Sequence, residues 1–282
     1  MIYRKIKKIL AFFIICMLLI TGISFGNNSL CTDDVYAATP KTIFDSVKTM
    51  SSTVNIDLTG DGKKEKVKFR ATENRYTSIA TFRINVNGKN ALTLKSLGYS
   101  VKVNYLKLST NNIYLYIVDC YENDDPTIDA IYRYNQNTQK LDRILTLETV
   151  NCNKGVCHIY STVKTSKNTL KVTYMGQMDA TGYITWVYDY KLKNGKFVLK
   201  NTTAKVISKW HKGKFVVNKK ITFYKKAGST KKAFTIKPGT AVKLQKMKLL
   251  NKTYYLQFKY GKKIGWIKAG QFDIFKNVML AG

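Results

Sequence analysis

Oxygen-bearing side chains alternate along one short segment of the sequence. Asp57, Thr59 and Asp61 stand at its first, third and fifth positions, the carbonyl of Lys63 falls at the seventh, and Glu65 stands at the ninth. Calcium takes hard oxygen ligands, and oxygen donors at alternate positions of a tight loop supply them. This spacing predicts a calcium site made by Asp57, Thr59, Asp61, Lys63 and Glu65.

Other features of this loop favour a different interpretation. Thr59 replaces a carboxylate, and Lys64 and Lys66 place positive charge beside the site. Gly62 allows a sharp turn with or without a metal, because it has no Cβ to restrict the backbone. The alternative to calcium binding is therefore a glycine-containing turn that hydrogen bonds hold together.

A second acidic cluster brackets Pro126 and consists of Asp119, Glu122, Asp124, Asp125 and Asp129. Paired carboxylates at a suitable separation hydrolyse glycosidic bonds, and clustered carboxylates bind cations. Such a run is also typical of a solvated loop between two strands. The cluster is thus a candidate for catalysis or cation contact, with a solvated loop as the alternative.

Nucleophilic catalysis has little support in the sequence. Cys157 and His158 are neighbours, but consecutive side chains of a strand point to opposite faces, so they cannot hydrogen-bond each other. The chain has 2 His, and the second, His211, lies in a distant segment. The sequence contains neither a Gly-x-Ser-x-Gly elbow nor a Walker loop. We therefore predict a protein without catalytic function.

The first residues have the pattern of a secretory signal peptide. Basic residues from Arg4 to Lys8 precede an uncharged apolar run from Ile9 to Ile23. Val35 and Ala37 then supply small residues at the −3 and −1 positions of a cleavage site. We predict removal of residues 1–37, so that the protein is secreted or associated with the cell wall. The alternative is an uncleaved segment, through which alone the protein would contact a membrane.

Three cysteines remain after that cleavage, at positions 120, 152 and 157. An odd number allows one disulfide and one free thiol. Cys152 and Cys157 flank a turn-forming sequence, which makes them the favoured pair over any that includes Cys120. Three reduced thiols are the alternative.

The elements that position these residues are almost all expected to be strands. Pro40–Met50 is the exception, because Ile43, Val47 and Met50 have near-helical spacing and predict one short helix. After it, apolar and polar residues alternate. Asn-Gly pairs at residues 87–88 and 194–195 predict hairpin turns.

Two of the expected strands have distinctive faces. Residues 113–118 are apolar on both faces, which predicts a central strand. The second is a long strand, one face of which is lined by Ile184, Trp186, Tyr188, Tyr190 and Leu192.

Roughly twelve strands fit between Glu65 and Thr203. We therefore predict an all-β protein whose N-terminal part is a β-meander with propeller-like sheets.

Positive charge is concentrated in the C-terminal part of the chain. The whole sequence of 282 residues has 48 Lys and Arg against 17 Asp and Glu, a formal net charge of +31. From Lys191 to Gly282 there are 24 Lys, no Arg and one acid, Asp273. This change in composition divides the mature chain into an all-β domain at residues 38–205 and a basic domain at residues 206–282.

A lysine-rich surface of this kind favours a polyanion over a nucleic-acid sequence. Arg rather than Lys makes the bidentate and stacking contacts that read bases, and export separates the protein from nucleic acid in the cell. We therefore predict no nucleic-acid partner. A polymer bound by charge density, such as wall teichoic acid, or anionic lipid headgroups fit the composition. The alternative is a lysine-rich surface that only maintains solubility.

The basic domain contains a series of steps in a fixed order over Lys214–Phe275. A first strand at Lys219–Tyr224 and a polar loop at Lys225–Lys232 are followed by Gly239-Thr240-Ala241-Val242 and a closing Gly265-Trp266-Ile267. This order resembles the bacterial SH3-type domain, which implies a small SH3-like barrel that holds the protein in the cell envelope. The family's Asn-x-Arg-x-Gly-Pro opening is absent, which affects the expected ligand groove more than the fold.

Candidate ligand-binding residues of this domain are Tyr224, Tyr255, Trp266, Lys225 and Lys226. Tyr255 lies on the strand face opposite Tyr254, Leu256 and Phe258, which we expect to build the core. For Trp266 the alternative is a place in that core.

The loop at Asp57–Val67 is similar to the acidic calcium loops of FG-GAP and VCBS propeller-type repeats. The likeness covers 11 residues in a single copy. It implies calcium as the cofactor of the N-terminal domain.

Together these patterns predict an exported, monomeric, non-catalytic protein. Its SH3-like module would bind a cell-wall polyanion or peptidoglycan, and its N-terminal domain would present a calcium-stabilised surface. The alternatives are a cell-wall hydrolase that uses residues 119–129 and a purely structural extracellular protein.

Overall fold

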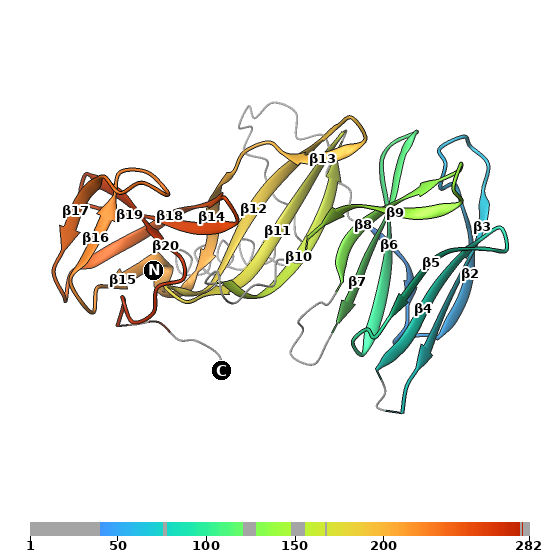
Figure 1. The fold of residues 1–282 in the computed structure, drawn as a ribbon, viewed down its shortest axis with the longest axis horizontal. Helices are drawn as coiled ribbons and strands as arrows, with labels where there is room; N and C mark the ends of the chain where they lie inside the picture. Colours follow the sequence, from blue (N-terminus) through green and yellow to red (C-terminus); the bar gives the residue numbers. More distant parts are fainter. Residues whose placement is uncertain are drawn as a thin grey trace, which may run out of the picture. The chain divides into compact units, whose positions relative to one another are not determined.

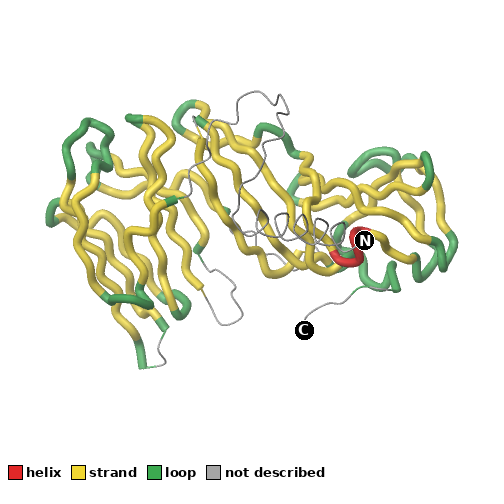
Figure 2. Tube along the Cα trace, turned by 180° about the vertical axis from the view of Figure 1, so that it is seen from behind, coloured by secondary structure: helices red, strands yellow, loops and turns green. Residues whose placement is uncertain are grey.

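The computed structural model describes residues 40–75, 78–120, 128–147, 156–166, 168–276 and 278. Glu122, Asp124, Asp125, Cys152 and the predicted signal peptide lie outside these residues. Within them the chain forms twenty strands and one short 3₁₀-helix, η2 at Trp210–Gly213 (Figure 2). The all-β prediction is therefore confirmed.

The first sheet is antiparallel, with four strands in the order β2-β3-β4-β5 (Figure 1). The strands are β2 at Ser51–Ile56, β3 at Glu65–Glu73, β4 at Ile79–Val86 and β5 at Lys89–Lys95. Asn87 and Gly88 join β4 to β5 with φ of 50° and 83°. Positive φ at both central residues is the geometry of a type I′ hairpin turn, so the predicted turn is confirmed.

The second sheet has five antiparallel strands in the order β1-β6-β7-β8-β9 (Figure 1). They are β1 at Lys41–Asp45, β6 at Ser100–Ser109, β7 at Asn112–Cys120, β8 at Asp129–Asn135 and β9 at Lys140–Thr146. The central strand is β7, and its residues 113–117 are buried on both faces of the sheet. The sequence pattern predicted this central position correctly.

These two sheets enclose one hydrophobic core. Phe44 of β1 stacks on Phe69 of β3 and on Phe82 of β4, with ring centroids 5.2 and 5.3 Å apart. Val103 of β6 and Ile117 of β7 belong to the same core. Because alternate residues of a strand share one face, this packing explains the alternation of buried and exposed residues along β3.

The third sheet contains eleven strands, and its main path runs β10-β11-β12-β14-β18-β19-β20-β16-β17. β13 pairs with β12 and β15 pairs with β18. Asn194 and Gly195 join β12 to β13 with φ of 50° and 73°, as predicted for a hairpin turn. The strands are β10 at Val156–Ser166, β11 at Thr169–Met178, β12 at Gly182–Lys193, β13 at Lys196–Leu199, β14 at Thr203–Lys209, β15 at Lys214–Val216, β16 at Ile221–Tyr224, β17 at Lys232–Ile236, β18 at Ala241–Leu250, β19 at Thr253–Tyr260 and β20 at Lys263–Lys268.

Strand β14 connects the two parts of this sheet. On one side it pairs with β12, where Trp186 lies opposite Val206. On the other side it pairs with β18, where Lys205 lies opposite Lys246. The predicted division between residues 205 and 206 falls inside this strand and stays a prediction.

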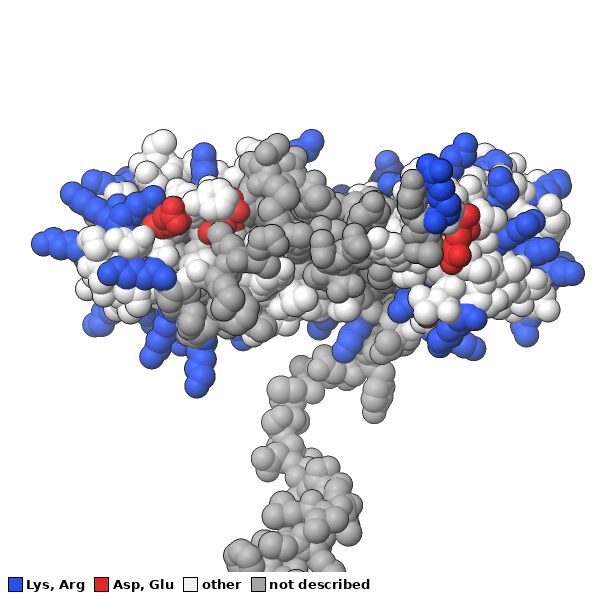
Figure 3. Space-filling model, turned by 90° about the horizontal axis from the view of Figure 1, so that it is seen from below, with Lys and Arg blue, Asp and Glu red and all other residues white. Residues whose placement is uncertain are grey.

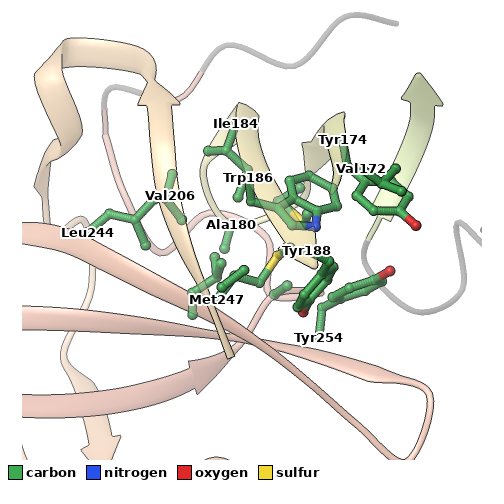
Figure 4. Close-up of a cluster of buried hydrophobic side chains, with 14 of the residues drawn as sticks. Val172, Tyr174, Ala180, Ile184, Trp186, Tyr188, Val206, Leu244, Met247 and Tyr254 are labelled. Carbon is green, nitrogen blue, oxygen red and sulfur yellow. The ribbon is translucent and has the colours of Figure 1, made fainter. Parts of the chain in front are cut away.

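A second hydrophobic core combines residues of the five-stranded sheet with residues of the third sheet. Figure 4 shows Tyr174, Trp186 and Met247 within it, and Tyr174 stacks on Trp186 with 5.5 Å between the ring centroids. The predicted apolar face of β12 is confirmed. Its buried residues are Ile184, Trp186, Tyr188 and Tyr190, and Leu192 is partly buried against the same core.

The predicted helix at Pro40–Met50 is wrong. Lys41–Asp45 forms β1 and pairs with β6, and a short turn then leads into β2. Val47, in the middle of the expected apolar stripe, is 75% exposed, whereas Phe44 is buried in the core of the sandwich that the first two sheets form. A β-bulge between Thr42 and Phe44 disturbs the alternation, which explains why the strand is hidden in the sequence.

No sheet in the described ranges closes into a barrel. The C-terminal strands continue the third sheet, with β17 paired to β16 and β15 paired to β18. The structure thus establishes an all-β chain of several antiparallel sheets. The propeller-like arrangement and the SH3-like barrel are not confirmed.

Candidate functional site

The three aromatic residues predicted to bind a ligand lie around one hollow of about 490 Å³. Tyr224 ends β16, Tyr255 belongs to β19 and Trp266 belongs to β20. Their sequence positions are far apart, so the sheet is what brings them together. The other lining residues are Lys226, Gly228, Ser229, Thr230, Ile267, Lys268 and Gln271.

Strand register places the aromatic side chains on one face of the sheet. Tyr224 lies opposite Trp266, and Trp266 lies opposite Gln257. Because side chains two residues apart in a strand share a face, Tyr255 projects from the same side as Gln257. The other face of β19 is buried as predicted and carries Tyr254, Leu256 and Phe258.

The loop between β16 and β17 forms one wall of the hollow. The N–H of Lys225 donates to the carbonyl of Lys231 at 2.9 Å and closes the loop. Gly228 has a φ of 75°, and a Cβ at this position would lie 2.9 Å from Leu250 Cδ2 and 3.6 Å from the hydroxyl of Tyr255. Glycine therefore lets the loop approach Tyr255 closely.

The lining residues differ in exposure and charge. Trp266 is only 9% exposed, which agrees with the alternative prediction that it belongs to the core. Tyr224 and Tyr255 are half-buried. Lys226 and Lys268 are exposed and add positive charge at the rim. Aromatic rings beside ammonium groups suit a ligand with both an apolar face and a negative charge. Lys225, also predicted as a ligand-binding residue, is exposed but does not line the hollow.

A second hollow of about 500 Å³ shares Tyr224 and Gln271 with the first. Lys219, Lys220 and Phe272 are among its lining residues. The two hollows therefore adjoin, and both combine an aromatic ring with exposed lysines.

Hydrogen bonds from its own backbone hold the Asp57–Glu65 loop. Asp57 Oδ1 accepts from the N–H of Gly60 at 2.6 Å and of Thr59 at 3.2 Å, and Oδ2 accepts from Gly62 at 3.1 Å. Burial acts to raise the pKa of Asp57, but these bonds outweigh it and the pKa is lowered. Asp61 Oδ1 accepts from the N–H of Lys63 at 2.8 Å.

Glu65 also accepts a hydrogen bond from this loop. It is buried, and its Oε2 accepts from the N–H of Leu58 at 2.7 Å. Across the described residues there is no group of three or more His, Cys, Asp and Glu side chains that could hold a metal ion. These contacts fit the hydrogen-bonded alternative, and calcium binding stays a prediction.

Asp119 and Asp129 are the described members of the acidic cluster, and both are fully buried. The carboxylate of Asp119 accepts from the N–H groups of Ile128 and Gly98, and that of Asp129 accepts from the hydroxyl of Ser161. These two carboxylates therefore stabilise the fold rather than face solvent. Cys157 and His158 are consecutive residues of β10, as predicted.

Sequence reasoning missed part of the hollow. Gly228, Ser229 and Thr230 belong to a segment predicted only as a polar loop, and Gln271 follows β20 without any pattern. Apart from Gly228, the sequence of this loop has no pattern that indicates its approach to Tyr255. The glycine within a lysine-rich loop is the one signal that could have suggested a close approach.

Comparisons with protein-family models, with curated proteins and with solved structures found no match. Within the described ranges, the chain also has no helix with the length and hydropathy that crossing a membrane requires.

Proposed function

We propose that this chain is an exported, monomeric, non-catalytic protein of the cell envelope whose C-terminal region binds anionic cell-wall polymer or peptidoglycan. The observation that carries the proposal is the convergence of Tyr224, Tyr255 and Trp266 on one hollow. Lys226 and Lys268 at its rim supply charge that an anionic ligand would neutralise.

The charge of the surrounding surface supports this ligand class. Residues 191–282 contain 24 Lys and one acid. In Figure 3, Lys and Arg project from much of the face in view, and acidic side chains form only small patches. Salt screens each exposed charge within about 8 Å, but a polymer with many negative groups engages many lysines at once.

The order of elements supports an SH3-like module. A short strand β16, a polar loop, and the strands from β17 to β20 follow one another as the resemblance implies. The Gly-Trp-Ile step contributes Trp266 to the hollow, so a residue of the resembling motif lies at the proposed site.

Calcium is proposed as a stabilising ligand of the N-terminal loop. Asp61 and the carbonyl of Lys63 belong to exposed residues of this loop, while Asp57 is half-buried. These groups would bind a cation in a loop whose conformation is already held by hydrogen bonds. Its role would be to stabilise the surface formed by the first sheet.

Co-sedimentation of the purified protein with cell walls tests the main proposal. We expect the protein to sediment at low salt and to be released as salt rises. Tyr255→Ala should weaken binding to peptidoglycan stripped of anionic polymer by about tenfold, a loss of roughly 1.4 kcal/mol. Tyr260→Ala is the matched control, because Tyr260 is on the same strand, is 41% exposed and does not line the hollow.

Two results would contradict the proposal. Absence of binding to both intact and stripped walls at low salt would favour the purely structural alternative. Clearing of cell walls by the purified protein in a zymogram would favour the hydrolase alternative.

A further inference from the structure

Lysines face one another across several strands of the third sheet. Lys205 of β14 lies directly opposite Lys246 of β18. Lys243 of β18 lies opposite Lys214 of β15 on one side and opposite Lys259 of β19 on the other. We call Lys205, Lys243, Lys246 and Lys259 the lysine ladder.

The ladder projects to the solvent side of the sheet. Leu244 and Met247, which alternate with its β18 members, are buried in the core, whereas all four ladder lysines are exposed. A β-bulge between Leu244 and Lys246 keeps Lys243 and Lys246 on the same face. The four ammonium groups therefore share one surface.

Such an arrangement does not stabilise the sheet. Residues directly opposite in antiparallel strands have Cβ atoms about 4.5–5.5 Å apart, and like charges in this position are destabilising. Counter-charges are scarce, because the only acid among residues 191–282 is Asp273, which follows the last strand. By contrast, Lys171 on β11 lies opposite Asp189 on β12. An anion bound from outside the chain would therefore relieve the repulsion along the ladder.

The ladder continues into the aromatic hollow. One row of opposite residues runs from Lys205 through Lys246 and Gln257 to Trp266 and then to Tyr224. In the neighbouring row, Tyr255 lies between Lys248 and Lys268. Charge and aromatic rings thus form one continuous surface.

We propose that the lysine ladder binds a linear polymer with repeating phosphate groups, laid across the strands. Lysine presents a compact point charge, which suits phosphates along a flexible chain better than planar groups that need paired contacts. This inference rests on the proposed function, and it assigns the charged part of the ligand to the ladder and the uncharged part to the hollow.

The test uses linear inorganic polyphosphate and the purified protein at low salt. Lys243→Gln/Lys246→Gln should weaken binding about tenfold and reduce the slope of log K against log salt by about 1.4, the value for two lost contacts with a flexible polyanion. Lys66→Gln/Lys68→Gln removes the same charge from the exposed face of β3 in the first sheet. This control should change affinity by twofold or less, and equal losses in both variants would overturn the proposal.

Stability gives an independent readout. Neutralising the ladder relieves repulsion, so the melting temperature of the ladder variant at low salt should be equal to or above that of the wild type. Lys171→Gln, which removes the positive charge opposite Asp189, should lower the melting temperature slightly. A ladder variant less stable than Lys171→Gln would show that these lysines contribute to folding and would overturn the argument.

Two further arms separate this inference from the rival ligand and from the proposed function. Vesicles of anionic phospholipid should bind at least tenfold more weakly than polyphosphate, and tighter vesicle binding would assign the ladder to a membrane surface instead. Tyr255→Ala should leave polyphosphate affinity unchanged. If it also leaves binding to stripped peptidoglycan unchanged, the proposed role of the hollow fails while the ladder stands.

Discussion

The sandwich of the first two sheets and the C-terminal part of the third sheet differ in where their charged side chains lie and what they contact. The sandwich uses carboxylates inside its structure: Glu65 and Asp119 are buried, and each accepts hydrogen bonds from backbone N–H groups. The C-terminal part exposes lysines opposite one another and has a single acid. A charge that the fold buries and hydrogen-bonds supports stability, whereas an exposed charge that faces like charges is available to a ligand.

The largest expected effect would come from removing a buried carboxylate of the sandwich. Asp119→Ala leaves the N–H groups of Ile128 and Gly98 without this acceptor, so we expect the free energy of unfolding to fall by about 3 kcal/mol. Lys246→Gln in the C-terminal part should change it by less than about 0.5 kcal/mol. Urea unfolding of both variants measures the contrast, and similar losses would erase the distinction between the two regions.

Two glycines of the Asp57 loop sharpen the comparison within the sandwich. Gly60 and Gly62 have φ of 82° and 86°. A Cβ on Gly60 would lie 2.5 Å from the carbonyl oxygen of Thr110, whereas a Cβ on Gly62 would have no described residue within 4 Å apart from its chain neighbours. Gly62→Ala adds only the backbone strain, about 1 kcal/mol, and Gly60→Ala should lose at least about 2 kcal/mol. Thermal unfolding ranks the two, and the reverse order would contradict the packing described here.

Calcium should act on the sandwich alone. A ligand that binds only the folded state at about tenfold above its dissociation constant stabilises that state by about 1.4 kcal/mol. Melting in EDTA and then in millimolar calcium measures this gain, and Asp61→Asn should reduce it. Identical midpoints in both conditions would leave the loop with its hydrogen bonds as sole support.

The smallest effect concerns the protonation of Asp57. Its pKa is lowered in the folded protein, so its stabilising contribution is present above the ordinary value of 3.8 and is lost as the pH falls through the lowered value. Melting temperatures followed from about pH 6 to about pH 2 should therefore decline less steeply in Asp57→Asn than in the wild type. Parallel curves would show that the Asp57 carboxylate does not contribute in this way.

Much of the fold follows from local patterns. Apolar residues at every second position identify β12, and the Asn-Gly pairs identify two turns because few other residues adopt positive φ. Tyr255 was predictable as a residue of the outer face because it alternates with the core residues Tyr254 and Leu256. These features depend on neighbours in the chain, and the sequence displays them.

Other features depend on pairings between distant segments. The sequence around Lys41–Asp45 has near-helical spacing of apolar residues, and the bulge of the strand disturbs its alternation. Its pairing with β6 determines that it forms a strand. The sequence predicted a concentration of positive charge in this region but not the lysine ladder itself. Lys205 and Lys246 become neighbours only through strand register. The wall built by the loop around Gly228 depends on Leu250 and Tyr255 in the same way.

Strand β14 would bear load between the two parts of the third sheet. Three residue pairs join it to β12, from Ile184–Lys209 to Trp186–Val206, and three join it to β18, from Thr203–Lys248 to Lys205–Lys246. If the C-terminal face is attached to a wall and the sandwich is pulled, these backbone hydrogen bonds bear load together with the core beside them and the bond from the N–H of Ala180 to the carbonyl of Ala269. We expect the three-pair ladders on each side of β14 to separate at a lower force than the longer pairings of β11 with β12 and of β18 with β19.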